Sequence, residues 1–175
     1  MRDDGLKITL AKKEDIPDLE SLVNSAYRGE GSKKGWTTEA DLLDGIRTNQ
    51  QVLAGMVSRG DSLVLKCANK KNELVGCVYL QKKEEILYLG MLTVAPEKQA
   101  NGIGKKLLLA AEEYAQTQDC TAITITLISL RQELIKWYER RGYKDTGERK
   151  PFPSNDPRFG LPRQELEFIV MEKRL

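Results

Sequence analysis

Two glycines and two lysines are the residues whose types and spacing first suggest chemistry. Gly102 and Gly104 stand where an apolar strand pattern gives way to a helical one, and Lys105 and Lys106 follow directly. The first turn of a helix carries unsatisfied backbone N–H groups and a partial positive charge. Glycines at that point let an anion, typically a phosphate, approach those N–H groups closely. The sequence therefore predicts an anion-binding loop at this helix start.

A strand and a helix must position this loop. Apolar and aromatic residues predict a buried strand over 85–94, which Pro96 ends because proline cannot donate a hydrogen bond to a sheet ladder. The apolar residues after the loop have the spacing of one helix face. They are Leu107, Leu108, Ala111, Tyr114 and Ala115.

The rest of the chain alternates strand and helix patterns. Helices are predicted from Asp15 to about Arg28, over 38–46, and from a capping box at Ser129 to Gly142. Proline content predicts an irregular loop over 150–162. The other predicted strands cover 6–10, 62–68, 73–81, 121–128, 166–172 and a segment from Tyr143 onward. The order β-α-α-β-β-β-α-β-α-β-β predicts an α/β (α+β) fold with a mixed sheet.

Composition excludes several classes of protein. The 175 residues suit one domain, 1–175, and a net charge of +2 argues against a protein that coats nucleic acid. The chain has no histidine, which excludes Ser-His-Asp and Cys-His catalysis and histidine-ligated metal sites. We therefore expect no nucleic-acid partner and no metal.

The three cysteines and the lack of long apolar runs bear on localisation. Cys67, Cys77 and Cys120 have no C-x-x-C spacing, and their apolar neighbours favour reduced, buried thiols, with a Cys120 nucleophile as the alternative. Residues 1–10 show no signal-peptide pattern, and no segment approaches the ~18 apolar residues of a membrane span. We expect a cytoplasmic protein without a membrane partner.

A second motif follows downstream, Tyr138-x-x-x-Gly142 with a tyrosine next. The first motif reads Gln99-x-x-Gly102-x-Gly104, after a strand ending in Val-x-Pro and before an apolar helix. In this order, with these intervening elements, the two motifs resemble those of the GCN5-related N-acetyltransferases (GNAT). The resemblance covers most of the chain.

The resemblance implies a fold and an activity. The fold would be one acetyltransferase domain with a mixed, mostly antiparallel sheet flanked by helices. The activity would be transfer of an acetyl group from acetyl-CoA, with CoA as product, to a primary amine by direct attack in a ternary complex. The acceptor would be a small molecule, an amino-acid-like compound or a peptide N-terminus. Homodimers are common in the family, and 166–172 could lie at an interface.

The resemblance also implies roles for residues. Tyr138 matches the tyrosine that stands beside the CoA sulfur as general acid. A backbone N–H near Leu92 would stabilise the oxyanion, and the amides of 101–105 would hold the pyrophosphate. The full set expected to bind acetyl-CoA is Leu92, Thr93, Val94, Gln99, Ala100, Asn101, Gly102, Ile103, Gly104, Lys105 and Arg131.

Two positions depart from the family pattern. Gly90 stands where the family often has a glutamate general base, and Arg131 stands where it often has an asparagine that contacts the pantetheine. Amine deprotonation would then use water, another acidic residue such as Asp41, or the fraction of amine that is already neutral.

The acceptor site is expected at Trp36, Asp41, Tyr88 and Phe159. Acidic residues at 39, 41 and 44 would favour a cationic substrate, although they also suit a solvated helix face. Arg158 in the proline-rich loop, with the arginine at 163, would favour a substrate with a carboxylate. That loop is either a wall over the site or an inert surface loop.

Other interpretations remain at this point. The glycine loop could be a structural turn, and Tyr138 could be a core aromatic residue. A non-catalytic acyl-CoA sensor is favoured by Gly90 in place of the base. A nucleotide-binding protein is disfavoured, because the loop lacks the Gly-Lys-Ser/Thr end of a P-loop.

Overall fold

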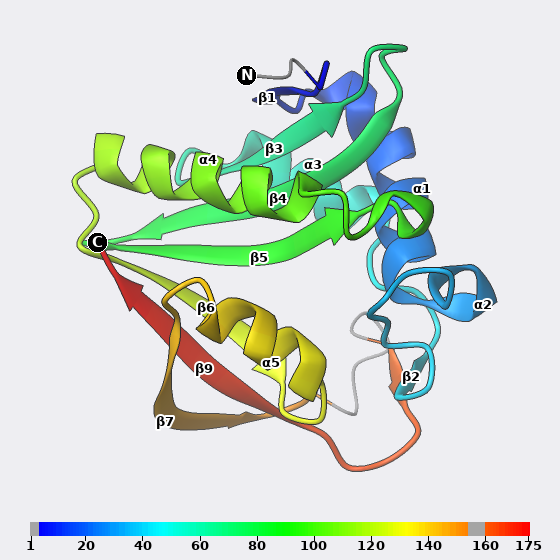
Figure 1. Cartoon of the computed structure of the whole chain (residues 1–175), viewed down its shortest axis with the longest axis vertical. Coiled ribbons are helices and arrows are strands. Elements are labelled where there is room, and N and C mark those ends of the chain that lie inside the picture. Colours follow the sequence, from blue (N-terminus) through cyan, green and yellow to red (C-terminus); the bar gives the residue numbers. More distant parts are fainter. Residues whose placement is uncertain (1–3, 154–159) are drawn as a thin grey trace.

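A computed structural model describes residues 4–153 and 160–175, and a seven-stranded sheet forms its centre (Figure 1). Every neighbouring pair in the sheet is antiparallel except β5 and β6, which run parallel. The mixed, mostly antiparallel sheet is therefore confirmed. In spatial order its strands are β1 (Lys7–Leu10), β3 (Ser62–Ala68), β4 (Leu74–Lys83), β5 (Ile86–Val94), β6 (Ala122–Ile128), β9 (Glu167–Arg174) and β7 (Lys144–Pro151).

Helices cover both faces of the sheet. On one face, α1 (Ile16–Tyr27) and α3 (Gln50–Ser58) pack on β3, β4 and β5. On the other face lie α4 (Ile103–Thr117) and α5 (Gln132–Glu139) (Figure 1). The predicted apolar stripe of α4 is buried, with Tyr114 only half-buried at its edge. No helix in the described part of the chain is long and apolar enough to span a membrane.

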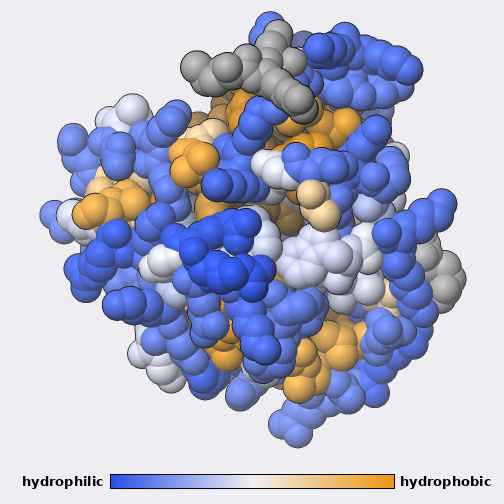
Figure 2. Space-filling view, in the orientation of Figure 1, coloured by the Kyte–Doolittle hydropathy of each residue, from blue (hydrophilic) through white to orange (hydrophobic). Residues whose placement is uncertain are grey.

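Eight large apolar side chains among the described residues reach solvent. The face seen in Figure 2 is mostly hydrophilic, with its apolar areas broken up by charged side chains. Isolated exposed apolar residues of this kind are normal for a folded domain. The exposed large ones are Leu10, Trp36, Ile46, Ile86, Leu109, Leu130, Leu161 and Leu175.

The helix predicted over 38–46 is wrong. That segment is a series of turns with a two-residue strand, β2 (Leu43–Asp44), and Gly45 has a left-handed φ of +84° that no α-helix contains. The helix lies later, at α3, where the Asn49 side chain accepts a hydrogen bond from the Val52 N–H at 2.9 Å. The short helix α2 (Gly29–Ser32) also forms within the glycine-rich segment that we expected to be a loop.

The proline-rich segment over 150–162 is more ordered at its ends than predicted. Strand β7 continues to Pro151, and β8 (Leu161–Pro162) pairs with β2. Proline is tolerated in such short, two-stranded or edge pairings because one side of the strand needs no donor. Phe159 and Arg158 lie outside the described residues.

Strands β5 and β6 pair only at their beginnings and then separate (Figure 1). The last paired residues are Tyr88 and Thr124. Further along β5, Met91 and Leu92 together lie opposite the single residue Val78 of β4, and Met91 has a φ of +53°. This is a β-bulge, which bends the strand that contains it. The bulge and the separation open a cleft between the two halves of the sheet.

The Asn49 cap of α3 gives a stability prediction. Replacing Asn49 with alanine leaves the Val52 N–H without its side-chain acceptor, so the free energy of unfolding should fall by about 1 kcal/mol. Urea denaturation followed by circular dichroism measures this. The Asn49→Asp variant is the matched control and should stay near the wild type, because aspartate caps equally well. Equal stability of the alanine and aspartate variants would contradict the capping role.

Candidate active site

Two adjoining cavities occupy the cleft between β5 and β6. The first, about 260 Å³, is named here the inner cavity and extends from Tyr88 on β5 to Tyr138 on α5. The second, about 300 Å³, is named the glycine-loop cavity and lies between Gly102 and Trp137. Because the cavities share lining residues, one bound molecule can lie against another across them. The shared residues are Thr37, Leu92, Val94, Gln99 and Leu134.

The glycine loop forms an open cradle at the start of α4. Gly102 is the residue before the helix and has a φ of +83°, and no side chain caps the first turn. A Cβ atom placed on Gly102 would meet nothing within 4 Å, so the space above the first-turn N–H groups is free. Lys105 lines the same cavity. An anion such as a pyrophosphate fits this arrangement of donors.

The edge of β5 beyond the bulge faces the cleft rather than a neighbouring strand. The Tyr27 hydroxyl donates to the Leu92 carbonyl at 2.7 Å, and the Gln99 amide donates to the Val94 carbonyl at 3.1 Å. The Ala95 N–H donates to β4 instead, at the Val75 carbonyl, which shows the alternation of a strand. The N–H groups of residues 92 and 94 therefore point to the cleft, where the amides of a pantetheine chain fit.

Tyr138 is the buried aromatic residue of α5 that reaches the inner cavity. Its ring lies edge-on to Trp137 and Tyr143, with centroids 4.9 and 5.4 Å away. No hydrogen bond joins its hydroxyl to a described residue, and Tyr138 lines the inner cavity, so the hydroxyl is available to a ligand there. Burial raises the pKa of Tyr138 well above its ordinary value, so the phenol is protonated at neutral pH.

Trp137 and Arg141 form a wall of the glycine-loop cavity that the sequence motifs did not indicate. The Arg141 guanidinium carbon lies 3.7 Å from the Trp137 ring centroid, and its Nη1 donates to the Trp137 carbonyl at 2.8 Å. This stacking fixes a positive charge beside the open cradle. The i, i+4 spacing of Trp137, on α5, and Arg141, two residues past its end, was the signal that could have found this wall.

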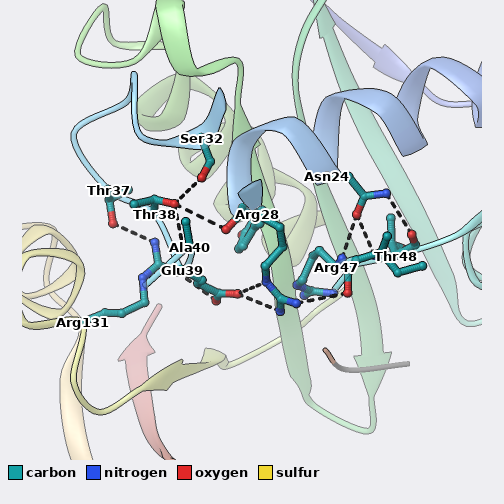
Figure 3. Close-up of polar contacts among 12 residues, drawn as sticks. Asn24, Arg28, Ser32, Thr37, Thr38, Glu39, Ala40, Arg47, Thr48 and Arg131 are labelled. Atoms are coloured by element: carbon teal, nitrogen blue, oxygen red, sulfur yellow. Dashed lines mark hydrogen bonds and ion pairs between the residues drawn. The ribbon is translucent and has the colours of Figure 1, made fainter. Parts of the chain in front are cut away.

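A buried ionic cluster closes one side of the inner cavity (Figure 3). Glu39 lies between two arginines, with Oε2 accepting from Arg28 Nε at 3.0 Å and Oε1 accepting from Arg131 Nη1 at 3.1 Å. Arg131 Nη2 donates to the Thr37 hydroxyl at 2.7 Å. Both Glu39 oxygens are thus occupied by guanidinium N–H groups. Neither Arg28 nor the interior position of Glu39 carried a sequence signal.

The ring of Tyr88 lies close to Gly90, the residue that stands where the sequence resemblance led us to look for a general base. A Cβ atom at Gly90 would lie 3.0 Å from the ring of Tyr88, and the Tyr88 hydroxyl is 3.3 Å from that of Thr126 on β6. The Tyr88 side chain thus occupies the space that a side chain at position 90 would need. Among the described residues that line the inner cavity, Glu39 is the only carboxylate.

Most of the residues predicted from the sequence lie at the two cavities. Asp41 does not: its side chain is 74% exposed and forms an ion pair with Lys33 at 3.3 Å. Asn101 is exposed at the loop and lines neither cavity, and Phe159 is outside the described residues. The predicted residues at the cavities are Trp36, Tyr88, Leu92, Thr93, Val94, Gln99, Ala100, Gly102, Ile103, Gly104, Lys105, Arg131 and Tyr138.

The cysteines take no part in either cavity. Cys67, Cys77 and Cys120 are buried and free, and none of them lines the cleft. Burial raises the pKa of all three thiols, that of Cys77 to about 12. A thiol is a nucleophile only as the thiolate, so these residues are poor candidates for covalent catalysis.

A model of a protein family matches most of the chain. The acetyltransferase (GNAT) domain matches residues 25–153, which include the cleft, the glycine loop and α5. No curated protein matches the chain.

Solved structures share the fold at low sequence identity. PaiA N-acetyltransferase from Thermoplasma acidophilum, in complex with coenzyme A, has a TM-score of 0.72 at 20% identity, over 97% of this chain and 99% of that one. The ribosomal-protein-S18-alanine N-acetyltransferase from Escherichia coli has a TM-score of 0.71 at 13% identity, over 97% of this chain and 93% of that one. IAA acetyltransferase from Bacillus cereus has a TM-score of 0.68 at 17% identity, over 97% of this chain and 99% of that one.

The ionic cluster predicts that Glu39 contributes far more to the free energy of unfolding than the neighbouring Asp41. Glu39→Ala should lower the free energy of unfolding by about 3–5 kcal/mol, because two buried guanidinium groups each lose an ion pair. Asp41→Ala, two residues away, should change it by less than about 0.5 kcal/mol, because an exposed ion pair contributes little. Chemical denaturation of both variants checks this. Similar losses for both would show that Glu39 is not held as described.

Proposed function

Because the chain belongs to the GNAT acetyltransferase family, and is therefore an acyltransferase with acetyl-CoA as cosubstrate, we propose that it acetylates a primary amine bound in the inner cavity. The observation that carries this proposal is the pair of joined cavities. One has an anion cradle at Gly102, and the other has the free hydroxyl of Tyr138. A donor and an acceptor can meet where the two cavities share their lining.

The acetyl donor would occupy the glycine-loop cavity and the edge of β5. The first-turn N–H groups at Gly102 and the charges of Lys105 and Arg141 suit the pyrophosphate. The N–H groups of residues 92 and 94 suit the amides of the pantetheine, as an added strand would. The cosubstrate supplies an acetyl group already activated as a thioester.

Within this arrangement two groups of the chain would act on the reacting atoms. The Leu92 N–H at the bulge would donate to the acetyl oxygen as that oxygen gains charge, an effect worth roughly 3–4 kcal/mol in comparable oxyanion holes. The Tyr138 hydroxyl would give its proton to the sulfur that departs with CoA. A leaving thiolate with a pKa near ~8.5 is stabilised by such a donor.

Direct attack in a ternary complex is the mechanism that we propose. The absence of cysteine from both cavities, among the described residues, supports transfer without a covalent enzyme intermediate. The shared lining at Leu92 and Val94 supports simultaneous binding of both substrates, since a molecule in either cavity touches the same residues. The small volume of the inner cavity favours a small amine or the end of a peptide.

Cofactor binding and turnover give the test of this proposal. Acetyl-CoA and CoA at a hundredfold excess over Kd should stabilise the protein by roughly 2.7 kcal/mol, a shift in Tm of about 5–10 °C, and ATP should give none. Release of free thiol from acetyl-CoA in the presence of an amine panel then measures transfer. Binding without turnover of any amine would favour a non-catalytic acyl-CoA sensor instead.

The Gly104→Val variant is the control for the place of binding. A Cβ atom at Gly104 would make ordinary contacts with Trp137 and Val94 at 3.5 and 3.6 Å, so the branched side chain should fill the cradle while the protein stays folded. We expect an unchanged Tm without ligand and loss of the acetyl-CoA shift. A full shift in this variant would place the cosubstrate elsewhere.

Tyr138→Phe tests the proton donor. Loss of the hydroxyl should lower kcat by about 10²-fold or more with little change in acetyl-CoA affinity, because the hydroxyl acts on the leaving group rather than on binding. Tyr143→Phe is the matched control, since that ring packs against Tyr138 but lines neither cavity. Steady-state kinetics of both variants decide the matter, and kcat within twofold of wild type for Tyr138→Phe would remove it from the mechanism.

A further inference from the structure

The charges that line the inner cavity are unbalanced. Three arginines, Arg28, Arg47 and Arg131, face a single carboxylate, Glu39, among the described lining residues. Glu39 is engaged by Arg28 and Arg131, so its charge is shared between those two. Arg47 has no carboxylate partner among the described side chains. Among these described residues, a cationic amine with no other charge would therefore meet more guanidinium groups than carboxylates.

Arg47 is held in place although its guanidinium pairs with no carboxylate among the described residues. The guanidinium carbon lies 5.2 Å from the ring centroid of Tyr27, a cation–π contact. The Asn24 side-chain oxygen accepts hydrogen bonds from the backbone N–H groups of Arg47 and Thr48 at 2.8 and 3.0 Å (Figure 3). Arg28 Nη1 donates to the Ile46 carbonyl at 3.1 Å, which fixes the backbone just before Arg47. A charge positioned in this way loses little entropy when it binds an anion.

Arg131 contributes a second donor at the cavity. The residue is only 6% exposed, and its Nη groups are occupied by Glu39 and Thr37. Its Nε–H is buried and has no hydrogen-bond acceptor among the described residues, and a carboxylate oxygen of Glu133 lies 4.0 Å from Nε. A buried donor without an acceptor is costly, which favours a ligand that supplies one.

These arginines are separate from the part of the cleft that suits the cosubstrate. Arg47 and Arg131 line the inner cavity and not the glycine-loop cavity, whose positive charges are Lys105 and Arg141. Arg163, which we had expected to attract a carboxylate, pairs with Asp44 and lines neither cavity. An anionic group bound at Arg47 in the inner cavity would therefore belong to the acceptor rather than to the cosubstrate.

Resting on the proposed function, we infer that the acceptor is a small amine that also carries a carboxylate, such as a free amino acid, and that Arg47 binds the carboxylate. A guanidinium matches the two oxygens of a carboxylate with parallel N–H donors. Arg131, whose buried Nε–H has no acceptor among the described residues, lines the same cavity and adds a second guanidinium group to it. The amine of such a molecule is a few ångströms from its carboxylate, which directs the amine toward the acetyl group at the shared lining.

The test compares amino acids with their own carboxamides. Each standard amino acid is assayed beside its own carboxamide, with acetyl-CoA as the acetyl donor. The release of free thiol gives kcat/KM for both members of the pair. The carboxamide has the less basic amine and is intrinsically the easier amine to present neutral, so a preference for the acid must come from recognition of the carboxylate. We expect at least one amino acid to exceed its carboxamide by about 10- to 100-fold.

Arg47→Gln identifies the residue responsible. The acid-to-amide ratio of kcat/KM should fall by about 10- to 100-fold in this variant and recover in part in Arg47→Lys, which keeps the charge. A merely structural role of Arg47 would lower both values together and leave the ratio unchanged. Arg59→Gln is the matched control, because Arg59 is exposed, pairs with Asp61 and lines neither cavity.

The outcomes separate this inference from the proposed function. No Tm shift with acetyl-CoA and no thiol release with any amine would overturn the proposed function itself. An acetyl-CoA shift with turnover of carboxamides or simple amines, and no preference for amino acids, would leave the function standing and overturn the inference. An acetyl-CoA shift without turnover of any carboxylate-bearing amine would overturn it as well.

Discussion

The separation of β5 from β6 after Tyr88 is the constraint on which the rest of the site depends. A strand that leaves its neighbour exposes N–H and C=O groups that must find other partners. Here the hydroxyl of Tyr27 and the amide of Gln99 satisfy the carbonyls of Leu92 and Val94. The N–H groups on the same edge are left to the cleft. The edge is therefore stable when empty and still able to bind a ligand that carries amides.

Glu39 joins the two walls of this cleft where no ladder of hydrogen bonds does. Arg28 directly follows α1, and Arg131 directly precedes α5, so one carboxylate connects elements on opposite sides of the opening (Figure 3). Burying such a cluster brings little net stability, because the desolvation of each charge offsets the attraction. Its geometric effect is to fix the width of the cavity and the positions of its guanidinium groups.

The sequence predicted the parts of the molecule that depend on local patterns. The strands were found because their apolar residues alternate or run together, and Gly102 and Tyr138 were found because their motifs combine a fixed spacing with a fixed element order. The prediction of a helix over 38–46 was wrong because Thr38 and Asp41 have the spacing of a helix cap. In the structure Glu39 is instead buried in an ion pair with Arg131, 92 residues away. Arg47 has no local signal either, since the side chain that orients it belongs to α1.

On the proposed function, Gly90 would leave deprotonation of the acceptor amine to the electrostatics of the cavity. A lysine-like amine has a pKa near ~10.4, so presenting it neutral at pH 7 costs about 4–5 kcal/mol. Nearby positive charges disfavour the ammonium form and so reduce that cost. A carboxylate on the proposed acceptor would pair with Arg47 and leave Arg131 as a second guanidinium group on the same cavity. On the proposed function, the guanidinium groups that would orient such an acceptor would therefore also favour its reactive form, and the proton would pass to water without a carboxylate on β5.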